Sequence, residues 1–147
     1  MQTRATGIRK KESSRDFSKK LLKLAVAGSA AFWVTNFVMA VSPIAEVYKA
    51  AFSISSLPVA LTEALVGGLV ISSCVSFFLL CFFDRIPGKN SILKALILSL
   101  SAMAIIEILS ALGNPSNASV YLLLDSVMNT PRFLALGLVI GYGFEKQ

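Results

Sequence analysis

The chain contains no histidine, and its only two cysteines, Cys74 and Cys81, lie seven positions apart in one apolar segment. On a helix they would be separated by about 10 Å along the axis, which is too far for a disulfide within that helix. Without histidine or a thiolate cluster, zinc and haem sites of the usual kinds are disfavoured, so we expect no metal and no cofactor. Both cysteines are interpreted as buried apolar filler.

Charged residues are also scarce, because they make up 15% of the 147 residues while 55% are hydrophobic. Soluble domains carry about 25% charged residues, so the deficit indicates a membrane protein. The length allows one domain, since four spans of about 20 residues leave only a tail and short loops. The serines lack the histidine that a hydrolytic site requires. We therefore expect a protein that is not an enzyme.

Four apolar stretches are long enough to cross about 30 Å of hydrocarbon. They predict an all-α integral membrane four-helix bundle with spans at about 21–42, 58–83, 91–112 and 119–144. Residues 1–20 form a basic cytoplasmic tail before this domain (21–147), and we expect the tail to be mobile or to lie on the membrane surface. Between the first two spans, Pro43 to Leu57 has apolar residues at helical spacing. This pattern predicts a short amphipathic interfacial helix or a kinked extension of the first span.

The first span has a second interpretation as a cleaved secretory signal. Its basic start and apolar stretch are followed by Val38-Met39-Ala40, which is typical of a cleavage site after Ala40. The region before the apolar stretch is long for a signal peptide, so we favour a retained helix.

Most basic residues lie at one end of the chain. The first 23 residues hold eight Lys and Arg against two acidic residues. A basic run directly before an apolar helix is typical of a cytoplasmic flank attracted to anionic lipid headgroups, rather than of nucleic-acid binding. With the N-terminus inside, twelve Lys and Arg lie on the cytoplasmic side, and only Lys49 lies outside. We predict a multi-pass protein of the cell membrane with both termini cytoplasmic.

Ionisable side chains inside the spans are the strongest functional signal. A charge in hydrocarbon costs at least about 2.5 kcal/mol, so it must be paired, hydrated or protonated. Four polar residues from four different spans lie five to seven residues from the outer helix ends: Asn36, Glu63, Glu107 and Asp125. We interpret this shared level, roughly 8–10 Å deep, as a polar layer and a possible ion or proton site. Its surplus carboxylates should be protonated, hydrated or balanced by a cation.

Arg132 lies about 13 residues into the fourth span, roughly 20 Å from either end, and therefore requires a partner. Helical side chains tilt toward their own N-terminus, which turns Arg132 and Glu107 toward each other on antiparallel helices. We predict that they pair. Asp125, Asn129 and Arg132 share one helix face, and Pro131 frees a backbone carbonyl beside them. Such a kinked helix suits a cation or water, although a purely structural ion pair would use the same residues.

Small residues recur at regular spacing in two spans. The second span carries them at every fourth position, at Ala60, Ala64, Gly68, Ser72 and Ser76. The fourth span carries Gly137-x-x-x-Gly141. This spacing lets membrane helices approach closely, so both patterns are interpreted as helix-packing faces within one chain or between copies.

Two functions remain open. The first is a small oligomeric transporter or channel for a cation, proton or cationic solute that crosses the polar layer. The alternative is a non-enzymatic accessory or scaffolding subunit of a larger membrane complex. A water-connected cavity at Glu63 and Asp125 would favour transport, whereas carboxylates on the outside of the subunit would favour docking. The expected partners are the lipid bilayer and either a second copy or another membrane protein, with no nucleic acid.

Overall fold

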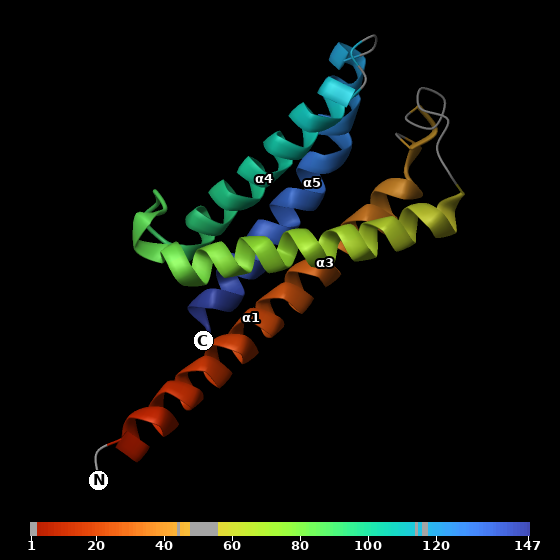
Figure 1. Cartoon of the computed structure of the whole chain (residues 1–147). Coiled ribbons are helices and arrows are strands. Elements are labelled where there is room, and N and C mark those ends of the chain that lie inside the picture. The colour runs from red at the N-terminus through yellow and green to blue at the C-terminus, as the bar shows by residue number, and fades with distance from the viewer. Residues whose placement is uncertain (1–2, 44, 48–55, 114, 116–117) are drawn as a thin grey trace.

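The computed structural model describes residues 3–43, 45–47, 56–113, 115 and 118–147, and this part of the chain contains no strand. Its elements are α1 (Thr3–Ala40), α3 (Leu57–Phe82), the 3-10 helix η1 (Phe83–Arg85), α4 (Ser91–Gly113) and α5 (Ala118–Glu145) (Figure 1). The four α-helices include segments long and apolar enough to cross a membrane. The predicted all-α architecture with four candidate spans is thereby confirmed. The orientation of the termini stays a prediction, and most of the expected interfacial helix lies outside the described residues.

The helix boundaries follow local sequence signals. Pro58 occupies the first turn of α3, where its missing N–H costs nothing because that group has no helical acceptor. Asn90 precedes α4, and its Oδ1 accepts a hydrogen bond from the backbone N–H of Leu93 at 2.9 Å. This bond is an N-cap that satisfies one free donor of the first turn. In the connection before α4, Gly88 has a φ of +142°, which residues with a side chain rarely adopt.

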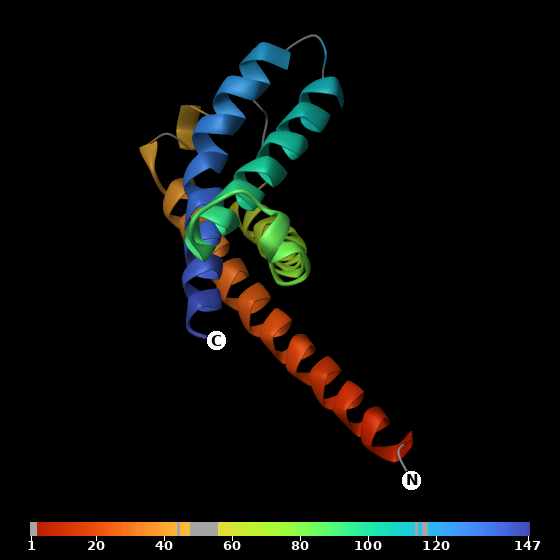
Figure 2. The same cartoon turned by 90° about the vertical axis from the view of Figure 1, so that its left-hand side faces the viewer.

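Helix α1 extends further toward the N-terminus than the apolar sequence indicates. The span was predicted to begin near residue 21, whereas the helix begins at Thr3 and its membrane-compatible part at Ser14. Lys and Arg are good helix formers, so the basic segment continues the helix although it is too polar for hydrocarbon. Figures 1 and 2 show this end of α1 standing clear of the other helices.

Helix α5 packs against both α4 and α1, while α3 packs chiefly on α1. The core lies where these helices meet, and its central contact is a T-shaped pair of the Phe32 and Phe133 rings with centroids 5.4 Å apart. Following the predicted orientation, we name the end at the α4–α5 connection the outer end and the end at the α3–α4 connection the inner end. In Figure 1, the outer halves of α4 and α5 diverge from α3.

The small residues of α3 face α1. A Cβ at Gly68 would lie 2.9 Å from the Phe32 ring, so no larger residue fits there without movement. The Oγ atom of Ser72 donates a hydrogen bond to the carbonyl oxygen of Ala25 at 2.8 Å. Ser76 is also fully buried, while Ala60 and Ala64 are partly buried. At Gly68 and Ser72 the ladder is therefore a contact within one chain.

The two glycines of α5 face α4 in its inner half. A Cβ at Gly141 would lie 2.5 Å from the Cα atom of Ile92, and one at Gly137 would lie 3.1 Å from the Cα atom of Leu96. Because these neighbours are backbone atoms, α4 and α5 approach as closely as glycine permits. This contact is also within one chain.

Candidate functional site

Glu107 is the most buried acidic residue of the described part of the chain, with 6% of its surface exposed. It lies on the α5-facing side of α4, where the Oγ atom of Ser126 donates a hydrogen bond to Glu107 Oε2 at 2.7 Å. The other oxygen, Oε1, is buried and has no hydrogen-bond partner among the described residues. The carboxyl group is therefore satisfied at only one oxygen.

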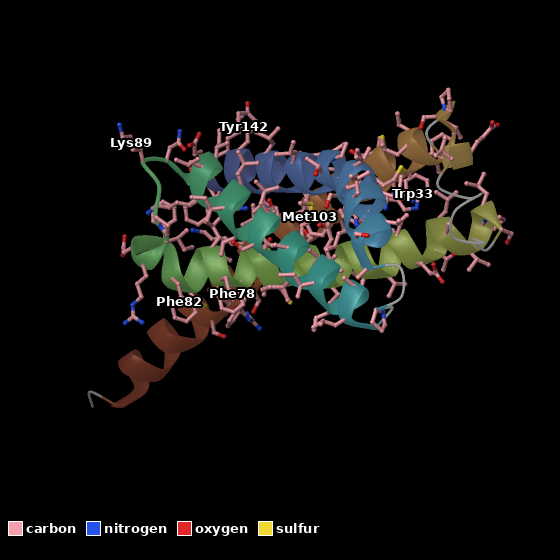
Figure 3. The ribbon with its side chains drawn as sticks, turned by 90° about the horizontal axis from the view of Figure 1, so that it is seen from above. Trp33, Phe78, Phe82, Lys89, Met103 and Tyr142 are labelled. Atoms are coloured by element: carbon pink, nitrogen blue, oxygen red, sulfur yellow. The ribbon has the colours of Figure 1, made fainter. Side chains whose placement is uncertain are left out.

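A second hydroxyl continues this contact one turn deeper. The Oγ1 atom of Thr130 donates to the carbonyl oxygen of Ser126 at 2.6 Å and lies 3.9 Å from the sulfur atom of Met103 (Figure 3). Met103 is one turn from Glu107 on α4, and Thr130 is one turn from Ser126 on α5. Across the α4–α5 contact, the carboxyl group of Glu107 thus meets Ser126, and the thioether of Met103 meets Thr130.

A separate polar group lies between α1 and α5. Asn36 and Asn129 are each one turn outward from the paired rings of Phe32 and Phe133, so they lie at the same level. Asn36 is only 4% exposed, and its Nδ2 atom has no hydrogen-bond partner within the described ranges. Asn129 is half-buried, and its Oδ1 atom accepts a hydrogen bond from Arg132 Nη1 at 3.1 Å.

The described contacts of the predicted polar layer fall into two groups. Ser126 and Glu107 meet at the α4–α5 contact, whereas Asn129 is engaged by Arg132 on α5. Asp125 is half-buried on α5, next to Ser126. The hydrogen bond observed at Glu107 comes from Ser126, whereas the predicted partner, Arg132, donates to Asn129. Arg132 makes further contacts besides this one, and its pairing with Glu107 stays a prediction.

Glu63 lies apart from both polar groups, because it is exposed on α3. Five residues separate it from Gly68, which is about 140° around a helix. Since Gly68 faces α1, Glu63 points away from the other helices. Depth along a span could be counted from the sequence, but the direction of the side chain depended on which face of α3 packs on α1.

Ser126 and Thr130 were not selected from the sequence. A usable signal was present, because they lie eleven and seven residues before Gly137 and so fall on the same helix face. Since that face was predicted to pack against another helix, extending it outward would have placed both hydroxyls in the same interface.

The inner end holds a different polar cluster. Lys94 is 8% exposed, its Nζ atom donates to the carbonyl oxygen of Phe83 at 2.6 Å, and the same atom lies 3.8 Å from the centre of the Phe83 ring. That ring stacks on Phe144 with centroids 4.9 Å apart. Ser91 Oγ donates to Glu145 Oε1 at 2.7 Å. These contacts fasten the α3–α4 connection to the end of α5, and a cation at the C-terminal end of α3 also suits the helix dipole.

An open groove of about 380 Å³ lies at the outer end between α1 and α3, lined by Trp33, Leu61, Thr62 and Leu65. The indole Nε1 atom of Trp33 donates to the carbonyl oxygen of Leu61 at 3.1 Å, which holds the ring in place (Figure 3). The groove is mostly apolar. It therefore offers a surface for lipid rather than a site for a charged ligand.

The described residues contain no group of three or more His, Cys, Asp or Glu side chains that could hold a metal ion. Comparison of the chain with protein-family models, curated proteins and solved structures finds no match. The class defined by the fold is an all-helical protein with four helices suited to a membrane.

Proposed function

We propose that this chain is a non-enzymatic membrane subunit that assembles with a second copy of itself through the uncovered face of α3. The observation that carries this proposal is the exposed carboxylate of Glu63, six residues into a helix suited to a membrane. A carboxylate that faces hydrocarbon costs at least about 2.5 kcal/mol, whereas a protein neighbour can supply a hydrogen bond. Of the two arrangements considered from the sequence, a carboxylate on the outside of the subunit favours assembly.

The uncovered face of α3 carries a repeat that suits helix pairing. Its residues alternate at spacings of three and four, and we name them the α3 seam: Ala60, Glu63, Gly67, Val70, Cys74, Phe77 and Cys81. Every seventh residue from Ala60 is small, and such a repeat is typical of left-handed helix pairs crossing at about +20°.

Packing within the chain leaves the α3 seam largely open. Nothing lies within 4 Å of a Cβ built at Gly67, and Val70 is 59% exposed. In Figure 1, α3 crosses in front of α1 and α5 with no helix on its viewer-facing side. Figure 3 shows Phe78 and Phe82 pointing away from α4 and α5. At the inner part of the seam, the centre of the Phe17 ring lies 6.2 Å from that of Phe77.

A second copy fits the α3 seam because the seam is self-complementary. In a two-fold pair of parallel α3 helices, each residue near the axis meets its own counterpart. Two Glu63 carboxyl groups can share one proton, so that one donates and the other accepts. The small residues at every seventh position allow the two backbones to approach closely. Between 22% and 33% of the most apolar stretch of each span is buried in one chain, which leaves surface for this contact.

The native cysteines provide a direct test. The interpretation of Cys74 and Cys81 as buried filler was wrong, because both are free and exposed on the side of α3 that α1 does not cover. In membranes, mild oxidation of the wild-type chain should give a disulfide-linked dimer, and Cys74→Ser with Cys81→Ser should abolish it. Ile108→Cys in the cysteine-free chain is the matched control, because it places an exposed thiol on α4. Glu63→Ala should weaken the dimer without unfolding the protein. A chain that stays monomeric in lipid and gives no cross-link through either native cysteine would disprove this assembly.

Transport of a proton or cation is a second candidate function. It is favoured by two buried atoms without described hydrogen-bond partners, Glu107 Oε1 and Asn36 Nδ2. Reconstituted protein should then show proton- or cation-dependent flux that Asp125→Asn or Glu107→Gln reduces while the cross-link through Cys74 persists. Wild-type protein that is inert across several cations and pH values would remove this candidate and leave assembly untouched.

A further inference from the structure

We propose that Glu107 is a proton-binding site whose carboxyl group carries a proton on Oε1 and exchanges it with the outer side. This inference is independent of assembly through the α3 seam, and it specifies the ligand of the second candidate function. The two oxygens of this carboxyl group differ in their hydrogen bonding. Oε2 accepts a hydrogen bond from Ser126, while Oε1 is buried without a described partner.

An ionised carboxylate accepts hydrogen bonds at both oxygens and donates none. Keeping that charge at a buried Oε1 with no donor would be strongly unfavourable, since no described protein group replaces the lost hydration. A proton on Oε1 makes the group neutral. Oε2 then becomes the carbonyl oxygen, and it keeps the hydrogen bond from Ser126. The observed contacts therefore match the neutral acid better than the carboxylate.

The charged residues of the helices around Glu107 do not supply a counter-charge at Oε1. Asp125, next to Ser126 on α5, is itself acidic and makes contacts of its own. Arg132 directs its Nη1 atom to Asn129. On α4 itself, Lys94 is 13 residues away, and its Nζ atom donates to Phe83 at the inner end. Glu63 lies on the face of α3 that points away from the other helices.

The outer end is the side from which a proton can arrive. Glu107 is six residues before Gly113, the last residue of α4, which corresponds to roughly 9 Å of helix. Toward the inner end, the space beside α4 is filled by the core, in which Phe133, Leu136 and Ile140 are at most 2% exposed. The site therefore lies close to one membrane face and is separated from the other by packed hydrocarbon.

Infrared difference spectroscopy of reconstituted protein tests the protonation state. Near neutral pH, the wild type minus Glu107→Gln spectrum should contain the carbonyl stretching band of a protonated carboxyl group, and that band should shift in D2O because the proton exchanges. Ser126→Ala should move the band to higher frequency, since it removes the hydrogen bond to Oε2. A merely structural role for Ser126 would change stability without this shift. Absence of the band from the difference spectrum would overturn the proposal.

A hydrophobic carbodiimide provides a second readout. The carboxyl oxygen bonds to the central carbon of the reagent while the carboxyl proton moves to one nitrogen, and an acyl shift then gives a stable N-acylurea without another reactant. We expect this adduct at Glu107 by mass spectrometry, whereas Glu145, which is exposed at the inner end, should remain unmodified. The helical circular dichroism of the purified variant verifies, independently of assembly, that Glu107→Gln is folded. Adducts confined to exposed acids would count against a neutral Glu107.

Discussion

At the inner end of the molecule, Lys94 donates to the carbonyl oxygen of Phe83 and Ser91 donates to Glu145. In the outer half, Glu107 has one oxygen without a described hydrogen-bond partner, and the amide nitrogen of Asn36 has none either. Both regions bury polar side chains in helices of similar composition. The two clusters differ in whether each buried polar atom has a hydrogen-bond partner, although the buried Ser76 hydroxyl in the inner half of α3 also has none among the described residues.

This difference predicts that the inner end contributes mainly to stability and the outer half mainly to function. A buried polar atom without a partner costs about 1–3 kcal/mol, so a region that retains such atoms is less stable than it could be. Polar groups that are fully engaged hold helices together, whereas partly engaged groups are available to a ligand. We therefore expect substitutions at the inner end to cost stability and substitutions in the outer half to cost function.

The largest effect is expected for Gly141→Leu in the inner half. A Cβ at Gly141 would lie 2.5 Å from the Cα atom of Ile92, so α4 and α5 must separate. We expect a loss of about 3 kcal/mol of unfolding free energy, measured by reversible unfolding in detergent. Gly113→Leu is the control, because nothing lies within 4 Å of a Cβ there. Equal losses from both substitutions would show that the close α4–α5 contact is not needed.

A smaller loss is expected for Lys94→Met, which keeps the aliphatic stem and removes the charge. The carbonyl oxygen of Phe83 then loses its donor, and the ring loses its cation. The free energy of unfolding should fall by about 2 kcal/mol. Lys89→Met, at an exposed position in the same connection, should change it little. If Lys94→Met is as stable as the wild type, the inner cluster does not fasten the α3–α4 connection.

The smallest effect is expected for Asn36→Leu in the outer half. Leu has a similar shape and replaces an amide whose Nδ2 atom lacks a described partner. The free energy of unfolding should stay the same or rise by about 1 kcal/mol, because a buried amide nitrogen without a described partner is removed. Asn129→Leu is the comparison, because it removes the acceptor of Arg132 Nη1 and should destabilise more. A large loss of unfolding free energy from Asn36→Leu would show that the polar groups of the outer half stabilise the fold, as those of the inner end do.

Several elements could be predicted from the sequence because they depend on neighbours along the chain. The start of α3 at Pro58 and the cap at Asn90 are set by backbone hydrogen bonding within one turn. The membrane-compatible length of each helix depends on composition alone. The small residues at Gly137 and Gly141 predicted close packing, since any helix that approaches them can do so only where a Cβ is missing.

The order of residues alone predicts four apolar helices with acidic residues at a countable depth, because rise per residue and transfer energy are properties of a single helix. Only the tertiary structure decided that Ser126 donates to Glu107, that Asn36 is buried, and that Glu63 points outward. These outcomes depend on which face of each helix meets a neighbour. A small rotation of one helix would exchange such partners without changing any local preference.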